Sequence, residues 1–153
     1  GWSTNIPMFN PLDVIDNLFK KMDNHSMAEM VPWAKGFQGT IQKKKPNMYV
    51  STGIIEKAGS SSVLIKELPL NVWVDDYKQF LDGLVKPAQG KSFVRSYTMQ
   101  HTTESVKFLV KLARAKTEGD ATPEEIDYVK KFKLESSLST NNMHLFDADG
   151  RLK

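Results

Sequence analysis

Cysteine is absent from this 153-residue sequence, which excludes disulfides, thiol nucleophiles and thiolate metal sites. That absence fits an intracellular protein without requiring one. The sequence also lacks an apolar run of roughly 20 residues, the length that a transmembrane helix needs. No basic segment followed by an apolar stretch opens the chain, as it would in a secretory signal. We therefore expect neither a membrane partner nor a secretory signal.

The familiar catalytic and cofactor-binding motifs are missing as well. There is no Gly-x-Gly-x-x-Gly, no phosphate-binding loop with its lysine, no His-Glu-x-x-His and no nucleophile elbow. His25, His101 and His144 are not at metal-ligand spacing. Asp75 and Asp76 fall at the expected start of a helix, where the helix dipole explains paired carboxylates better than acid–base catalysis does. The residues therefore predict no catalytic group, no metal site and no cofactor in this chain.

What is present is typical of a globular domain. Hydrophobic residues make up 40% of the chain and charged residues 25%, and 153 residues suffice for one domain with a core. The 21 Lys and Arg against 18 Asp and Glu give a net charge of +3. This mildly basic balance is compatible with nucleic acid but does not by itself indicate it. The chain does not begin with methionine, and we expect it to be part of a longer protein.

Periodicity and turn residues predict an α+β fold of antiparallel strands with about three helices, in one compact or elongated domain. Helices are expected over residues 10–22, 75–85 and 122–132. Strands are expected over residues 35–41, 47–57, 62–68, 92–99 and 104–112, with two short ones near 132–138 and 143–146. The first three strands suggest a meander, and the next two suggest a hairpin.

The first helix is clearly delimited in sequence. Asn10 followed by Pro11 is typical of a helix start, with an N-cap side chain and a proline at the first helical position. Five apolar residues then recur at helical spacing, and we expect that stripe to pack into the core. The stripe consists of Leu12, Ile15, Leu18, Phe19 and Met22.

Ile6 lies just before this helix, on a segment that Pro7 and Pro11 hold extended. An apolar side chain displayed before a rigid proline can be a core plug or a wedge. Because most isoleucines are buried, chemistry alone favours the plug.

Five ordered blocks of the sequence resemble type IIA DNA topoisomerases, and eukaryotic topoisomerase II more than bacterial gyrase. The first is Gly-Trp-Ser-Thr-x-Ile-Pro followed by Phe-Asn-Pro-Leu. The others are Pro-Trp-x-x-Gly-Phe-x-Gly-Thr-Ile, Glu-Leu-Pro-x-x-x-Trp, a Tyr–His–Val-x-Phe hairpin, and Leu-Ser-Thr-x-Asn-Met-x-Leu-Phe-Asp. Ala34 and Val74 depart from the family pattern, as does the spacing of Tyr97 and His101. The resemblance implies that residues 1–153 form the tower region of the DNA-cleavage core.

In that family the isoleucine of the first block inserts between base pairs of the gate duplex and helps to bend it. The resemblance therefore assigns Ile6 as a DNA-intercalating residue and reverses the preference for a plug. It also implies a nuclear, homodimeric parent enzyme that uses Mg²⁺ and ATP. The catalytic tyrosine, the metal site and the ATPase would lie outside this chain, which we expect to be inactive and monomeric on its own.

The partner implied is double-stranded DNA, bound without sequence specificity. Lysine runs at turns are usually solvated, and phosphate contact is the alternative. On charge and position, the candidates for phosphate contact are Lys35, Lys43, Lys44, Lys45 and Arg95. A competing interpretation is a structural or interaction spacer between cleavage core and coiled coil, with no DNA affinity of its own.

Overall fold

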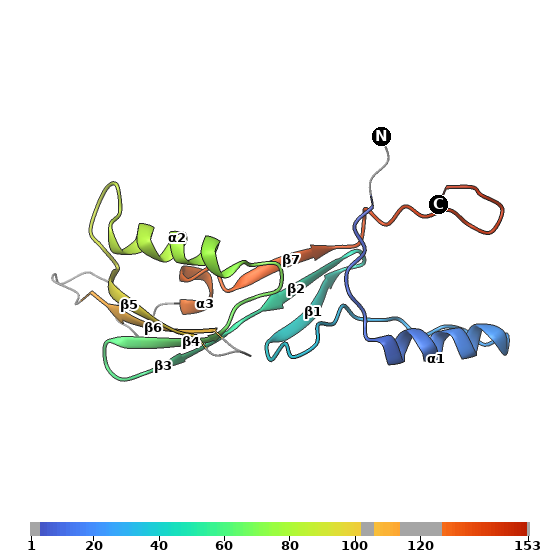
Figure 1. The fold of residues 1–153 in the computed structure, drawn as a ribbon, viewed down its shortest axis with the longest axis horizontal. Coiled ribbons are helices and arrows are strands. Elements are labelled where there is room, and N and C mark those ends of the chain that lie inside the picture. The colour runs from blue at the N-terminus through green and yellow to red at the C-terminus, as the bar shows by residue number, and fades with distance from the viewer. Residues whose placement is uncertain (1–3, 102–105, 114–126, 153) are drawn as a thin grey trace. The chain divides into compact units, whose positions relative to one another are not determined.

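The computed structural model describes residues 4–101, 106–113 and 127–152. They form an α+β fold with three helices and two antiparallel sheets, which confirms the expected class (Figure 1). The chain divides into two units. One contains residues 4–37, 41–51 and 137–152, and the other contains 38–40, 52–101, 106–113 and 127–136. No helix among these residues is long and apolar enough to cross a membrane.

The second unit is built on a four-stranded sheet with the order β3-β4-β6-β5. Its strands are β3 (Ile54–Lys57), β4 (Ser62–Glu67), β5 (Val94–His101) and β6 (Val106–Leu112). All three neighbouring pairs are antiparallel, so the predicted hairpin of β5 and β6 is confirmed. The connection was predicted over residues 100–103, but Gln100 and His101 belong to β5, and residues 102 and 103 lie outside the described residues.

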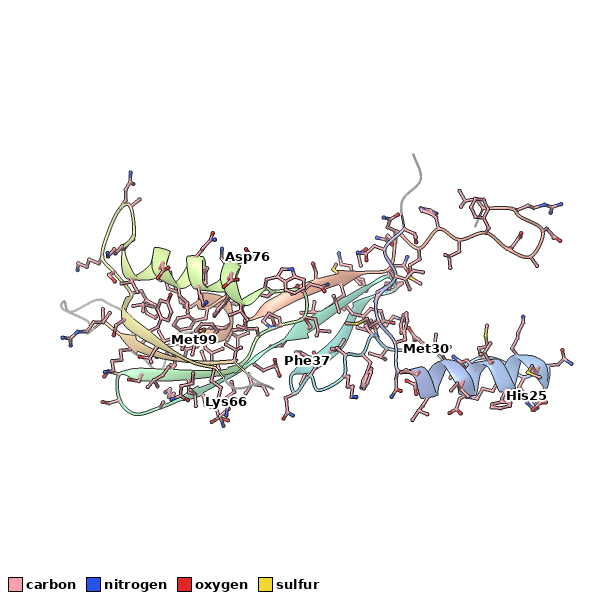
Figure 2. The ribbon with its side chains drawn as sticks, in the orientation of Figure 1. His25, Met30, Phe37, Lys66, Asp76 and Met99 are labelled. Carbon is pink, nitrogen blue, oxygen red and sulfur yellow. The ribbon has the colours of Figure 1, made fainter. Side chains whose placement is uncertain are left out.

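Helix α2 (Val74–Val85) lies over one face of this sheet (Figure 1). Its apolar spacing correctly predicts the buried side, because Tyr77 and Leu81 are buried while Phe80 and Leu84 pack against the same core. Figure 2 shows Met99 between the sheet and α2, with Lys66 extending from the opposite side. The core of this unit is formed by Val63, Ile65, Leu68, Tyr77, Leu81, Val94, Phe108, Val110, Leu112, Phe132 and Leu134.

Two features of the second unit differ from the sequence-based expectation. The predicted strand 47–57 is divided at Gly53 into β2 (Met48–Thr52) and β3, which belong to different sheets. In β5, alternation predicts Phe93, Arg95, Tyr97 and Met99 on one face and Val94 on the other, but Arg95 is exposed. A register shift between Val94 and Ser96 instead brings Val94 into the same core, because a bulge breaks the two-residue period.

Helix α3 (Tyr128–Lys131) is shorter than the helix predicted over 122–132. Asp127 is its N-cap, and its side chain accepts a hydrogen bond from the Lys130 N–H at 3.2 Å. The predicted start at Thr122 falls outside the described residues.

The first unit contains a three-stranded sheet with the order β1-β2-β7. Strand β1 (Thr40–Lys45) includes the lysine run, so the expected strand over 35–41 with a turn at the lysines is wrong. The turn contains only Pro46 and Asn47. The three lysines stay in the strand because their aliphatic stems can lie along an exposed strand while the ammonium groups remain in water. Strand β7 (Glu135–Ser139) is the only strand after α3 in the described residues, so the strand predicted near 143–146 is wrong.

Helix α1 (Pro11–Met22) begins and ends where the sequence predicts. Its apolar stripe, however, does not pack into the core of this chain. Every member of the stripe is exposed, and Asn17 is the only buried residue of the helix. The helix therefore presents a polar residue to its own unit and apolar residues outward.

Candidate functional site

Ile6 lies on a short extended segment that is fixed at both ends. On one side, the Asn5 N–H donates to the Asn142 carbonyl at 2.6 Å, and the Thr4 hydroxyl donates to the same oxygen at 3.3 Å. On the other, the Trp33 N–H donates to the Met8 carbonyl at 2.8 Å. The backbone that carries Ile6 is thus held across only a few residues, and Pro7 restricts it further.

The Ile6 side chain is 44% exposed, so it is not buried as a core plug within this chain. The segment continues into Phe9, which forms an antiparallel bridge with Pro32. It then reaches Asn10, whose side chain caps α1 by accepting from the Leu12 N–H at 3.0 Å. A stiff apolar side chain on an anchored backbone loses little conformational entropy when it inserts into another surface.

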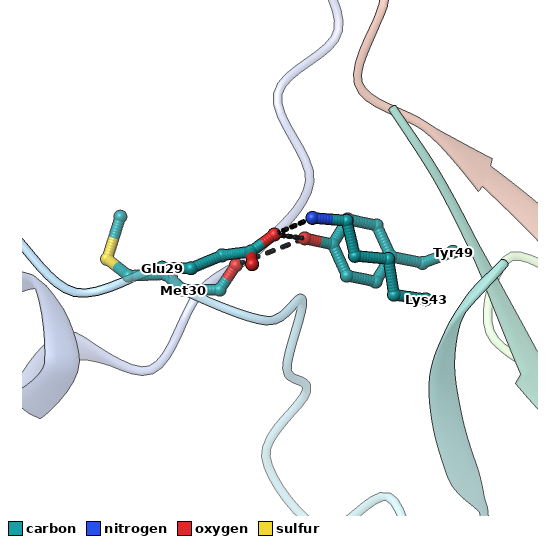
Figure 3. A network of polar contacts seen from close by, with 4 residues as sticks. All are labelled: Glu29, Met30, Lys43 and Tyr49. Atoms are coloured by element: carbon teal, nitrogen blue, oxygen red, sulfur yellow. Dashed lines mark hydrogen bonds and ion pairs between the residues drawn. The ribbon is translucent and has the colours of Figure 1, made fainter. Parts of the chain in front are cut away.

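The loop over residues 27–34 connects this segment to the lysine strand. Trp33 binds the Ile6 segment through its backbone, as described above. At the other end of the loop, the Glu29 carboxylate forms an ion pair with the Lys43 ammonium on β1 (Figure 3). The Tyr49 hydroxyl of β2 donates to the same carboxylate at 3.1 Å and lies 3.4 Å from the Met30 carbonyl (Figure 3). The lysine strand and the Ile6 segment are therefore both attached to one loop.

The charges in this cluster perturb one another. The hydrogen bond from Lys43, and then the one from Tyr49, lower the pKa of the Glu29 carboxyl. The hydrogen bond to Glu29 in turn raises the pKa of the Lys43 ammonium. Burial, followed by the bond to Glu29, raises the pKa of the Tyr49 hydroxyl. All three groups are thus held in their ordinary ionisation states at neutral pH.

The other predicted basic residues are exposed as well. Lys44 and Lys45 are exposed on β1, where successive side chains point to opposite faces. Lys35 is exposed beside Gly36, which has φ +81°. Arg95 is exposed at the bulge of β5 and belongs to the second unit. The first unit therefore contains Ile6 and the four candidate lysines, but not Arg95.

Sequence reasoning did not identify Glu29, Tyr49, Asn17 or Asn142 as partners. Glu29 is the only acidic residue between Asp23 and the lysine run, which is the one local signal for its role. Asn142 contacts Asn5 only through its backbone carbonyl, so the identity of its side chain could not have predicted this contact. Within the described residues, no group of three or more His, Asp or Glu could hold a metal ion.

Comparison with known proteins identifies the family. Residues 1–153 match the family of the DNA gyrase/topoisomerase IV A-subunit. The chain belongs to this family of type II topoisomerases. It is 37% identical over 157 residues to DNA topoisomerase 2 of Arabidopsis thaliana, covering 100% of this chain and 10% of that protein. Human DNA topoisomerase 2-alpha is 36% identical over 155 residues, again covering 100% of this chain and 10% of the relative.

A solved structure shares the fold. It is the DNA-binding, cleavage and re-ligation domain of Plasmodium falciparum topoisomerase II, with a TM-score of 0.86 and 35% identity. The match covers 99% of this chain and 20% of that one. The topoisomerase chain thus spans a tenth of the length of the relatives named above and a fifth of this solved domain.

Proposed function

We propose that these residues form the tower region of a eukaryotic-type DNA topoisomerase II, where they hold and bend the duplex that the enzyme cleaves. The observation that carries the proposal is the exposed Ile6 on a segment fixed at Asn5 and at Met8. Ile6 wedges a base step, and exposed lysines of the same unit contact phosphates without selecting sequence. The relatives' names, which include DNA topoisomerase 2 and a DNA-binding and cleavage domain, support this assignment.

The free-energy cost of deforming DNA means that this chain contributes to bending the duplex but does not bend it alone. Unstacking costs a few kcal/mol per base step, and smooth bending costs on the order of 1–6 kcal/mol. One small chain with a net charge of only +3 cannot offset both terms alone. We therefore expect weak, non-specific duplex binding by this chain, with a dissociation constant of roughly 10⁻⁴–10⁻⁶ M at physiological salt.

The intact enzyme supplies what this chain does not. In the proposed parent, a nuclear homodimer, two such regions flank one duplex, and strand passage uses Mg²⁺ and ATP bound outside these residues. The chain by itself is monomeric and neither cleaves DNA nor hydrolyses ATP. A light-scattering mass of twice the chain would contradict the monomeric state.

The test compares Ile6→Ala with Met8→Ala, a matched control two residues along the same segment. Met8 is also apolar and exposed, and its hydrogen bond uses the backbone carbonyl, which alanine retains. Fluorescence anisotropy at two salt concentrations measures binding, and energy transfer between the ends of a labelled duplex measures bending. We expect Ile6→Ala to reduce bending while Met8→Ala does not. Because this chain alone cannot offset the cost of bending, bending is compared in the full-length enzyme, where equal bending by both variants and by the unchanged enzyme would overturn the wedge.

A second candidate function is a spacer between the cleavage core and a coiled coil, with no DNA affinity. The observation in its favour is that lysines are paired with acids in both units. Four such pairs occur in the described residues: Lys43–Glu29, Lys66–Glu56, Lys78–Asp75 and Lys130–Asp127. Absence of duplex binding even at low salt would favour the spacer over the DNA-contacting role.

A further inference from the structure

The segment that carries Ile6 is attached on both of its sides to the three-stranded sheet of its own unit. On the N-terminal side, the Asn5 N–H donates to the carbonyl of Asn142, a few residues after β7. Just after β7, the Thr140 N–H donates at 3.0 Å to the carbonyl of Asn47, the residue that precedes β2. The attachment on this side of Ile6 therefore leads to the start of β2.

The attachment on the other side is made by the loop over residues 27–34. Phe9 forms its antiparallel bridge with Pro32, and the Trp33 N–H donates to the Met8 carbonyl at 2.8 Å. Both contacts use the backbone of the loop. The Ile6 segment can therefore be rigid on this side only if the loop itself is held in place.

Tyr49 of β2 holds this loop. Its side chain is only 4% exposed, and its hydroxyl donates to the Glu29 carboxylate at 3.1 Å and lies 3.4 Å from the Met30 carbonyl (Figure 3). Met30 is separated from Pro32 by Val31 alone, so a displacement of Met30 also displaces the residue that bridges the Ile6 segment. Strand β2 thus fixes the Ile6 segment from both directions.

We propose that Tyr49 is a positioning residue for DNA bending, whose hydroxyl fixes, through the loop, the backbone that presents Ile6 to the duplex. This inference rests on the proposed function, since it takes Ile6 as the wedge. A wedge on a fixed backbone loses little conformational entropy when it inserts, whereas a wedge on a loose backbone must first be ordered. Because the Tyr49 side chain is buried, it acts on DNA only through the loop.

The experiment measures bending by the full-length enzyme at saturating concentration, from energy transfer between the ends of a labelled duplex. Tyr49→Phe removes the hydroxyl and keeps the buried ring. The ion pair between Lys43 and Glu29 still attaches the loop to β1, so we expect bending to be weakened but not abolished. The ratio of bent to straight duplex should fall roughly 2- to 10-fold, the range that loss of one hydrogen bond allows.

Tyr77→Phe is the matched control. It also removes a buried phenolic hydroxyl, one that donates to the Phe132 carbonyl at 2.8 Å, but it lies in the other unit. We expect Tyr77→Phe to lower stability and to leave bending unchanged.

The double variant of Ile6→Ala with Tyr49→Phe separates positioning of the wedge from a general structural role. If the Tyr49 hydroxyl acts through Ile6, its removal has no further effect on bending once residue 6 is alanine. A structural role would instead lower bending by the same factor in both backgrounds.

Three results would overturn the role of Tyr49 while leaving the wedge in place. The first is a loss of bending in Ile6→Ala but none in Tyr49→Phe. The second is an equal loss in Tyr49→Phe and Tyr77→Phe, which would assign the effect to stability. The third is an undiminished effect of Tyr49→Phe in the Ile6→Ala background. Normal bending by Ile6→Ala itself would overturn the wedge, and the role of Tyr49 with it.

Discussion

Asn17 and Ala28 form a two-point clamp between α1 and the loop that follows it. The Asn17 Oδ1 accepts from the Ala28 N–H at 2.8 Å, and its Nδ2 donates to the Ala28 carbonyl at 2.9 Å. The amide side chain thus acts like the edge of a strand, satisfying both backbone groups of one residue. This clamp sets the rotation of α1, and it belongs to the same loop that holds the Ile6 segment and Lys43.

Replacing Asn17 with alanine should release this loop locally. Each hydrogen bond contributes about 0.5–1.5 kcal/mol, so the pair contributes roughly 1–3 kcal/mol to the closed loop. We expect amide exchange at Ala28 to accelerate by about tenfold or more, since 1.4 kcal/mol corresponds to a factor of ten. Asp16→Ala is the control, because Asp16 is exposed on the same helix. Unchanged exchange at Ala28 in Asn17→Ala would mean that the clamp does not order the loop.

The two glycines Gly53 and Gly83 should respond to alanine in opposite directions. A Cβ at Gly53 would lie 2.3 Å from the Glu67 carbonyl oxygen, so the backbone must move. We expect Gly53→Ala to destabilise the chain by about 1–3 kcal/mol, as overpacking does. Gly83 lies inside α2 with nothing within 4 Å of its added Cβ. Gly83→Ala should stabilise by about 0.5–1 kcal/mol because glycine is a poor helix former.

Urea denaturation of the two variants measures both effects on the same scale. The comparison is informative because the two substitutions add the same methyl group and differ only in what surrounds it. A Gly53→Ala variant as stable as the unchanged chain would contradict the close approach of Gly53 to the Glu67 backbone.

Amphipathic periodicity correctly predicted the buried face of a helix where that face packs against the helix's own unit. In α2, the spacing of Tyr77 and Leu81 identified the buried side correctly, because sheet and helix belong to one unit. The same pattern in α1 led to a wrong prediction. A stripe of leucine, isoleucine and phenylalanine shows that a face must be covered, but not by what, and in α1 nothing within the described residues covers it.

Strand boundaries failed for a different reason. Lys43, Lys44 and Lys45 have turn-like polarity, yet they continue β1 because an exposed strand tolerates charged side chains on both faces. Val94 was misplaced by a bulge, which depends on the hydrogen bonding of a partner strand and leaves no mark in local alternation. Of the candidate site, Pro7 and Pro11 indicated the stiff segment that carries Ile6, whereas the role of Ile6 as a DNA wedge came from the resemblance and stays a prediction. Glu29 was not predictable, since its partner lies 14 residues away on a strand predicted as a turn.

Tyr77 should make the chain sensitive to alkaline pH. Its hydroxyl is buried and donates to the Phe132 carbonyl at 2.8 Å, and burial raises the pKa of this phenol well above its ordinary value. The unfolded chain loses this proton near pH 10, whereas the folded chain keeps it. The folded state therefore binds more protons above that pH, so the stabilisation is complete below about pH 10 and is lost as pH rises further.

We expect the free energy of unfolding to fall by up to about 1.4 kcal/mol per pH unit from this group above pH 10. Urea titrations at about pH 9 and pH 11 measure the slope. Tyr77→Phe removes the titrating group and should flatten it, although the variant is less stable at pH 9 because the Phe132 carbonyl loses its donor. Tyr97→Phe is a comparison variant, since burial and the hydrogen bond to the exposed Asp82 raise the pKa of Tyr97 too, and its removal should also take away part of the slope. A slope that Tyr77→Phe leaves unchanged would rule out Tyr77 as its source.

Lys43 and Lys44 are neighbours on β1, but they should contribute unequally to duplex binding. The Lys43 ammonium is paired with Glu29, so contact with a phosphate requires it to leave a carboxylate. Lys44 is exposed, and its neighbour in sequence points to the other face of the strand. Affinity falls as salt rises, and each phosphate that a protein neutralises makes the plot of log affinity against log salt steeper by about 0.9. Lys44→Ala should therefore reduce that slope by about 0.9, and Lys43→Ala should reduce it by clearly less.

Glu29→Gln provides the matched test of the same argument. Glutamine keeps an oxygen that can accept from Tyr49 but removes the charge that holds Lys43, so the ammonium becomes available to DNA. We expect Glu29→Gln to steepen the salt dependence and tighten binding, and we expect Lys43→Ala in that background to reverse the gain. Anisotropy titrations of a labelled duplex at several salt concentrations measure the unchanged chain and all four variants. If Lys43→Ala and Lys44→Ala weaken binding equally with Glu29 present, the ion pair does not withhold Lys43 from DNA.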